Sequence, residues 1–222
     1  MQLRFRALMR AGASFALSLV CLAVRANSPD APPADPRLGP PFVSRTRAVL
    51  GAETARVVVI EFSSFKCTHC RAFHEEVFPR LREQYIDTGK VQWVTINASN
   101  EAADRSLPVF LIARGALQQG RYWEWVGSLY RVGRRPPDEL TALLAHPPPS
   151  GGASLEASLR DPAVREAVAA DFSEYAALGI RGTPTFLLRK LGPDGRCTRG
   201  ILEDTQPLDY FQRVLDELLK GP

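Results

Sequence analysis

The sequence predicts an α/β fold in which a helical segment is inserted into one sheet domain. Two apolar stretches rich in β-branched residues, 57–60 and 91–97, have the composition of strands buried on both faces. The amphipathic helical pattern between them suits the right-handed crossover that joins parallel strands. The third observation is a long stretch, residues 99–178, in which apolar residues recur at helical spacing.

The chain begins with a pattern typical of a secretory signal peptide. Arg4, Arg6 and Arg10 form a positive start, residues 11–24 are apolar, and Ala26 ends a small-residue cleavage motif. The apolar run is too short to span a bilayer comfortably, although an uncleaved anchor is an open alternative. We therefore predict that residues 1–26 are removed and that the protein is periplasmic or otherwise exported.

Removal of this segment changes the charge balance. The whole chain has 28 basic and 24 acidic residues, and the segment holds four arginines and no acid, which leaves 24 against 24. A chain without net basic charge gives no sign of a nucleic-acid or membrane-surface partner, and we expect no nucleic acid to bind. About 196 residues remain (222 minus 26), enough for one domain with an insertion.

The elements follow in order along the mature chain. Residues 27–44, rich in Pro, Ala and Asp, are expected to form a flexible leader, and residues 45–98 the first part of the sheet domain. Within this part, a helix is expected from Cys67 to about Tyr85, with a kink at Pro79. A turn at residues 87–89 then leads into the strand 91–97.

Residues 99–178 are expected to form a helical insertion. Its helices are predicted near residues 109–117, 122–132 and 138–145, with a loop at 146–152. A further helix is N-capped by Asp161, begins with Pro162 and ends at Gly179. Residues 179–222 complete the sheet domain with a hairpin of 185–190 and 196–202, followed by a last helix that Pro207 opens.

The motif Cys67-Thr68-His69-Cys70 lies where the first buried strand passes into a helix. Unpaired backbone N–H groups at a helix start favour a thiolate, which is the attacking species in disulfide exchange. Cys67 is therefore the predicted nucleophile, and Cys70, one turn on, the resolving thiol. A purely structural disulfide would constrain little chain, and zinc would need a second ligand pair, for which only Cys197, His74 and His146 remain.

Two polar residues near this pair are candidates for assisting it. The ring of His69 could donate to the Cys67 sulfur, or it could be a solvent-facing turn residue. Glu61 ends an otherwise apolar strand. If buried it would titrate abnormally and could exchange protons with Cys70; the alternative is a partly solvated strand-end charge. The remaining thiol, Cys197, is expected to be a small apolar residue on a hairpin strand, with a partner-linking thiol as the alternative.

Two segments resemble one family, the DsbA-type periplasmic thiol–disulfide oxidoreductases. The first runs from Glu61 to Pro79 and reads E-F-x-S-F-x-C-x-H-C-x-x-F-x-E-E-V-x-P, and the second is the G-I-R-G-T-P-T-F of residues 179–186. The resemblance covers roughly residues 48–220. It implies a thioredoxin-like fold with an inserted helical domain, a reversible Cys67–Cys70 disulfide, and no cofactor or resident metal.

The resemblance also assigns roles around the pair. Residues between the two cysteines set the redox poise, and the acid at the position of Glu61 exchanges protons with the buried thiol. Pro184 falls in the family's cis-proline loop, whose preceding backbone at Thr183 would bind an extended substrate; an ordinary trans turn is the alternative.

We therefore predict an enzyme that oxidises cysteines of exported proteins and is reoxidised by a membrane redox partner. By the resemblance, isomerases carry an N-terminal dimerisation domain, for which this sequence has no room, so a monomer is expected. Thr68 and Thr183 leave a reductase or isomerase open. A different class of function, a carrier of soft metal such as copper(I) held by Cys67, Cys70 and His69 or His74, is also open.

Overall fold

The computed structural model describes residues 19–21, 47–99, 107–145, 155–192 and 197–220. The predicted leader 27–44, the loop 146–152 and most of the predicted signal peptide lie outside the described residues. Residues 193–196, at the predicted hairpin of 185–190 and 196–202, also lie outside them. Within the described ranges, no helix combines the length and the apolar character that crossing a membrane requires.

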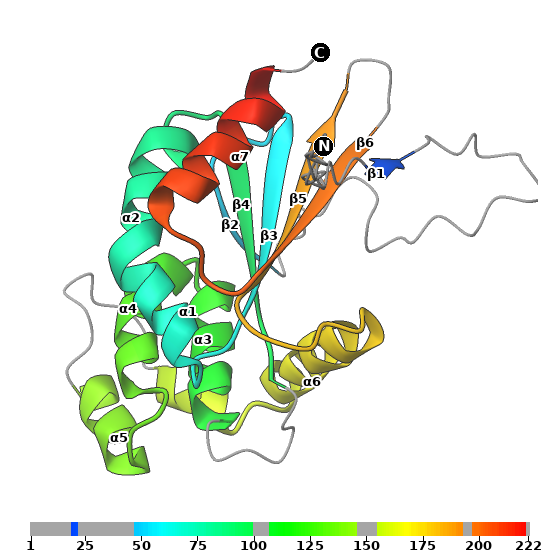
Figure 1. Ribbon diagram of the computed structural model, residues 1–222. Coiled ribbons are helices and arrows are strands. Elements are labelled where there is room, and N and C mark those ends of the chain that lie inside the picture. Colours follow the sequence, from blue (N-terminus) through cyan, green and yellow to red (C-terminus); the bar gives the residue numbers. More distant parts are fainter. Residues whose placement is uncertain (1–18, 22–46, 100–106, 146–154, 193–196, 221–222) are drawn as a thin grey trace, which may run out of the picture.

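The predicted buried strand, β3 (Val57–Ser63), lies in the centre of a mixed sheet with the order β1-β6-β5-β3-β4-β2. It pairs in parallel with β4 (Val91–Asn97), as the predicted crossover requires. On its other side it pairs antiparallel with β5 (Thr185–Leu191), which forms the predicted hairpin with β6 (Cys197–Glu203). The mixed sheet with its helices is a thioredoxin-like fold (Figure 1).

The two edges of the sheet hold strands that the sequence did not predict. β2 (Ala48–Leu50) pairs antiparallel with β4, and three residues are too few to carry a readable periodicity. β1 (Leu19–Cys21) pairs antiparallel with β6 and lies inside the predicted signal peptide. The predicted cleavage after Ala26 would remove β1 and leave the other five strands of the described sheet.

The helix that follows β3 is built from four consecutive pieces. They are α1 (Thr68–Ala72), the π-helical turn η1 (Phe73–Val77), α2 (Phe78–Leu81) and the π-helical turn η2 (Arg82–Ile86). Pro79, at which the sequence predicts a kink, lies in α2 directly after the π-helical turn η1. The sequence did not indicate the π-helical turns, which are rare and frequently mark functional sites.

Between β4 and β5 the chain forms the four predicted helices and one short 3₁₀ turn that was not predicted. These are α3 (Leu107–Gln118), α4 (Tyr122–Val132), α5 (Pro137–Ala145), the 3₁₀ turn η3 (Leu155–Leu159) and α6 (Pro162–Ala177). The Asp161 side chain accepts a hydrogen bond from the Ala163 amide at 2.8 Å, so the predicted N-cap is present. The last helix, α7 (Leu208–Lys220), begins directly after Pro207.

Side chains of β3 divide between two cores because they alternate across the sheet. Ile60 and Phe62 belong to the core that helices α3, α4 and α6 complete. Val57 and Val59 belong to the core on the other face, which the α1–η2 helix and α7 cover (Figure 1). Both faces of the strand are therefore buried, and the strand ends at the redox motif.

Candidate active site

The Cys67 sulfur lies at the start of α1, as the sequence predicts. Cys67 has an extended backbone and is the N-cap residue, and its sulfur accepts a hydrogen bond from the Cys70 amide at 3.4 Å. The turn before it closes through a bond from the Cys67 amide to the Ser64 carbonyl oxygen at 3.0 Å. The end of β3 and the helix start together direct backbone N–H groups at this sulfur.

The two cysteines have opposite acidities, and both thiols are free in the structure. The pKa of Cys67 is lowered to about 5, and a hydrogen bond from the Cys70 side chain is the largest cause. Burial opposes the shift, and the Thr183 side chain and the amides of Cys70 and His69 contribute to it. Burial raises the pKa of Cys70 far above its usual value, and the bond to Cys67 and the charge of Cys67 add to this effect. At neutral pH, Cys67 is a half-exposed thiolate and Cys70 a buried thiol.

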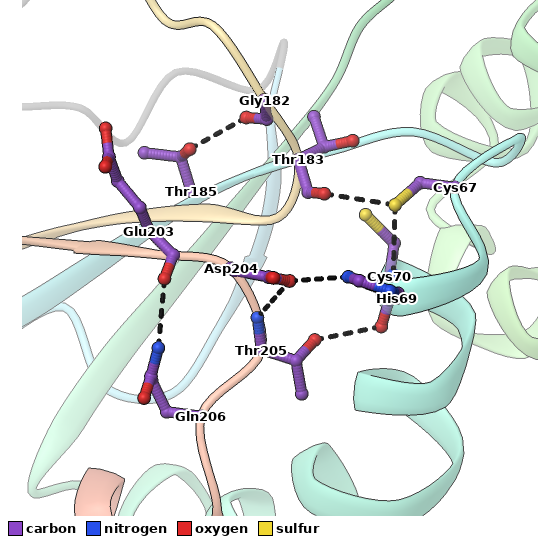
Figure 2. A network of polar contacts seen from close by, with 10 residues as sticks. All are labelled: Cys67, His69, Cys70, Gly182, Thr183, Thr185, Glu203, Asp204, Thr205 and Gln206. Carbon is purple, nitrogen blue, oxygen red and sulfur yellow. Dashed lines mark hydrogen bonds and ion pairs between the residues drawn. The ribbon is translucent and has the colours of Figure 1, made fainter.

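The loop of residues 182–185 faces this pair, although 116 residues separate Cys67 from Thr183. The Thr183–Pro184 peptide bond is cis, as predicted. The Thr183 carbonyl oxygen lies 3.0 Å from the Cys67 sulfur and accepts a hydrogen bond from the protonated thiol (Figure 2). Thr185 secures the loop by donating its hydroxyl to the Gly182 carbonyl at 2.8 Å.

The ring of His69 has a different partner from the one predicted. Its Nδ1 lies 2.7 Å from Oδ1 of Asp204, and both side chains are exposed, at 62% and 57%. The ring therefore bonds to the loop after β6 and not to Cys67 as predicted. The Cys67 sulfur accepts a hydrogen bond from the backbone amide of His69 instead. Hydrogen bonding and charge attraction by Asp204 raise the pKa of His69. Sequence reasoning missed Asp204 because it is far away along the chain.

Glu61 is fully buried, so the alternative of a partly solvated charge is wrong. Its carboxylate accepts hydrogen bonds from Trp93 Nε1 at 3.0 Å and from the Thr95 hydroxyl at 3.1 Å, and it lies 2.8 Å from His74 Nε2. Burial by itself would raise the pKa of Glu61, but the charge and hydrogen bond of His74, with bonds from Ser63 and Trp93, bring it below its usual value. The carboxylate is therefore ionised at neutral pH.

The hydroxyl of Ser63 connects this carboxylate with the resolving thiol. It lies 2.6 Å from the Tyr130 hydroxyl, and it lowers the pKa of both Glu61 and Cys70. Ser63 and Glu61 share one face of β3 because their positions differ by two. The sequence therefore showed that Ser63 lies on the same face of the strand as Glu61. It did not show that Cys70 is directed toward that face.

The end of α4 supports the loop that carries Cys67. A side chain at Gly133 would place its Cβ 2.2 Å from the Phe65 carbonyl oxygen, so only glycine fits this approach. Beside it, Arg134 donates to the Lys66 carbonyl at 3.0 Å. The helices between β4 and β5 thus help to fix the position of the nucleophile.

In the part of the chain that the structure describes, no group of three or more His, Cys, Asp or Glu side chains could hold a metal ion. His74, considered as a copper ligand from the sequence, is instead the partner of Glu61, and its ring stacks on Tyr130 at a centroid distance of 4.4 Å.

Disulfide exchange needs an accessible thiolate and a second thiol that can close the ring behind it. Cys67 and Cys70 supply both on a thioredoxin-like frame, which defines the class of thiol–disulfide oxidoreductases. The comparison with known families agrees: residues 44–192 match the family model described as Thioredoxin. The chain belongs to this family.

Individual relatives extend over most of the chain. "Probable disulfide bond formation protein D" of Bacillus anthracis is 29% identical over 154 residues, which are 65% of this chain and 70% of the relative. Among solved structures, alpha-DsbA1 of Wolbachia pipientis has a TM-score of 0.63 at 21% identity, covering 78% of this chain and 90% of that one. Oxidised BdbD from Bacillus subtilis has a TM-score of 0.65 at 20% identity, covering 80% and 95%.

Proposed function

We propose that this protein forms disulfide bonds in exported proteins through a reversible Cys67–Cys70 disulfide. A substrate thiolate attacks the Cys67 sulfur of the oxidised pair, the Cys67–Cys70 bond breaks, and Cys70 leaves and takes a proton. A second substrate thiolate then attacks the substrate sulfur of the mixed disulfide and releases Cys67 as a thiolate. Two electrons have then moved from the substrate to the pair, and a membrane partner is proposed to accept them.

The observation that carries this proposal is the low pKa of Cys67. A thiol with a low pKa is the better leaving group, so release of an oxidised substrate from Cys67 is favoured. The relatives named for disulfide bond formation support the same direction. The arginine-rich, apolar N-terminal pattern supports export to a compartment in which disulfides persist.

The loop of Thr183 and Pro184 is proposed as the place where substrate backbone binds. It lies directly against the nucleophile, with the Thr183 carbonyl 3.0 Å from the Cys67 sulfur. Backbone hydrogen bonds to this loop would hold an extended peptide without selecting its side chains. Such binding suits an enzyme that meets many different exported proteins.

Proton exchange between Cys70 and Glu61 is proposed to pass through Ser63. Cys70 is buried and protonated in the reduced pair, so closing the disulfide requires its proton to leave. Glu61 is an ionised carboxylate at neutral pH, and the Ser63 hydroxyl lies close enough to both groups to lower the pKa of each. A hydroxyl can accept one proton while it donates another, so it can act as a one-step relay.

Replacing Ser63 with alanine is therefore expected to slow reoxidation of the reduced pair by about tenfold to a hundredfold, at or below the usual contribution of general acid–base catalysis. Stopped-flow oxidation by a small disulfide measures this rate, and the pKa of Cys67 should stay near 5. Ser64→Ala, the same change one residue on, is the matched control. Equal rates for the two folded variants would contradict the relay.

The direction of the enzyme depends on whether folding favours the reduced or the oxidised pair. Because the pKa of Cys67 is lowered on folding, the thiolate's stabilisation is complete above the unfolded pKa of about 8.5 and is lost as the pH falls through about 5. At pH 7 the thiolate stabilises the reduced protein by at most about 2.7 kcal/mol. The actual contribution is smaller, because Cys67 is half exposed and solvent screens its charge. The disulfide's restriction of the unfolded chain opposes it with about 1.9 kcal/mol.

The difference in stability between the reduced and the oxidised protein is thus expected to change sign with pH. At pH 5 the oxidised protein should be the more stable form, and at pH 8.5 the reduced protein should be, since the thiolate then contributes roughly 2.4–4.8 kcal/mol. Urea unfolding of both forms at pH 5, 7 and 8.5, with the thiolate titrated by ultraviolet absorbance, measures this. Oxidation of a reduced two-cysteine peptide tests the activity directly. An oxidised form that remains more stable at pH 8.5 would favour a reductase instead.

A further inference from the structure

We propose that Asp204 is a positioning residue that sets the redox equilibrium of the Cys67–Cys70 pair by acting through His69. The proposal rests on the disulfide exchange described above. Asp204 follows β6, and its carboxylate lies 2.7 Å from the Nδ1 atom of His69, the residue before Cys70 (Figure 2). It is separated from His69 by 135 positions in the chain.

The turn at Asp204 contacts both halves of the site. Its backbone N–H donates to the Pro184 carbonyl at 2.8 Å, and the Thr205 hydroxyl donates to the His69 carbonyl at 3.1 Å. One two-residue segment therefore joins the start of α1 to the cis-proline loop; Figure 2 shows its contacts with His69. Movement of this segment would alter the geometry around Cys67 from both sides.

The backbone at Asp204 indicates that its side chain is used. Its φ is +64°, in the left-handed region that glycine adopts most easily and that aspartate tolerates. Among the described residues it is the one non-glycine with positive φ. An aspartate here gives up the conformational ease of glycine and keeps a carboxylate, which accepts bonds from the Thr205 amide at 2.7 Å and from His69.

The charges explain how Asp204 would act on the cysteines. The titratable groups that act on His69 are Asp204 and Cys67, and both favour its protonated form. Asp204 therefore increases the fraction of His69 rings that carry a positive charge at neutral pH. A positive ring stabilises the Cys67 thiolate, which exists in the reduced pair and not in the disulfide. The pair should consequently be more oxidising with Asp204 than without it.

A direct effect of Asp204 on the sulfur would have the opposite sign. A carboxylate acting only as a nearby negative charge disfavours the thiolate, so its removal would lower the pKa of Cys67. If Asp204 acts through His69, its removal should raise the pKa of Cys67. The sign of the change therefore separates the two modes of action.

The experiment measures the equilibrium in which the protein disulfide and two glutathione molecules give the protein dithiol and glutathione disulfide. Asp204→Asn, which keeps the side-chain shape, is expected to shift this equilibrium about two- to fivefold toward the protein disulfide, the range for exposed ion pairs. The His69 ring should titrate at lower pH by NMR. Asp204→Gly, which suits the positive φ, should give the same shift if the carboxylate is the cause.

Two comparisons isolate the contribution of His69. In a His69→Phe background, Asp204→Asn should produce no shift or one of opposite sign. Glu203→Gln removes a negative charge one residue away; Figure 2 shows this side chain directed away from the Asp204–His69 contact. This control should leave the equilibrium within about 1.5-fold of the unmodified protein.

The proposal is overturned if Asp204→Asn leaves the equilibrium unchanged, lowers the pKa of Cys67, or has the same effect with and without His69. Failure of the unmodified protein to equilibrate with glutathione at all would instead count against the proposed function. The two failures are therefore distinguishable in one series of measurements.

Discussion

Cys67→Ser is expected to abolish disulfide exchange, whereas Cys70→Ser should retain attack and accumulate mixed disulfides. Cys67 is the half-exposed thiolate, so its removal eliminates both bond formation with substrate and turnover. Cys70 is buried and protonated, so its removal eliminates only the escape from the intermediate. Non-reducing gels of protein isolated from cells after acid quenching would measure both results.

The double variant, with both cysteines replaced by serine, is the control for non-specific crosslinking. Equal trapping by the two single variants would contradict the division of roles. The trapped complex also tests the proposed substrate loop: a cysteine peptide bound through Cys67 should slow hydrogen exchange at the Thr183 amide. Unchanged exchange there would place the peptide elsewhere.

Glu61→Ala is expected to destabilise the protein by about 3–5 kcal/mol, the usual result of removing one member of a buried charged pair. The substitution leaves three buried groups without their acceptor: His74 Nε2, Trp93 Nε1 and the Thr95 hydroxyl. The free energy of unfolding of a whole domain is only about 5–15 kcal/mol, so this variant should be close to unfolding. Urea unfolding of the reduced protein at pH 7 measures the change.

Glu61→Gln keeps one acceptor oxygen and should lose less, about 1–3 kcal/mol. As a control, Glu76→Ala removes an exposed acid from η1, the helical turn that also contains His74. This variant should change the free energy of unfolding by no more than about 0.5 kcal/mol. Because the pKa of Glu61 is lowered on folding, its contribution is present above the ordinary value of 4.5 and is lost as the pH falls through the folded pKa. A Glu61→Ala variant as stable as Glu76→Ala would refute the role of this pair.

Features that depend on neighbouring residues were readable from the sequence. The buried strand before Cys67, the helix that starts at the motif, the N-cap at Asp161 and the hairpin after Pro184 were predicted correctly. Local rules suffice for these because hydrophobic periodicity and capping act within a few residues. The cis Thr183–Pro184 bond was expected from its resemblance to a family motif, and the structure agrees.

The partners of the polar side chains were decided only by the tertiary structure. His69 pairs with Asp204 rather than with Cys67, and Glu61 is buried against His74 and hydrogen-bonded to Trp93. A hydrogen bond requires its two atoms to come within about 3 Å in a suitable direction, and sequence spacing sets neither across separate elements. The sequence by itself therefore determined which cysteine meets the helix start and hence the chemistry of the site. The packing of the loop after β6, the cis-proline loop and α4 around the start of that helix decided which side chains tune the site.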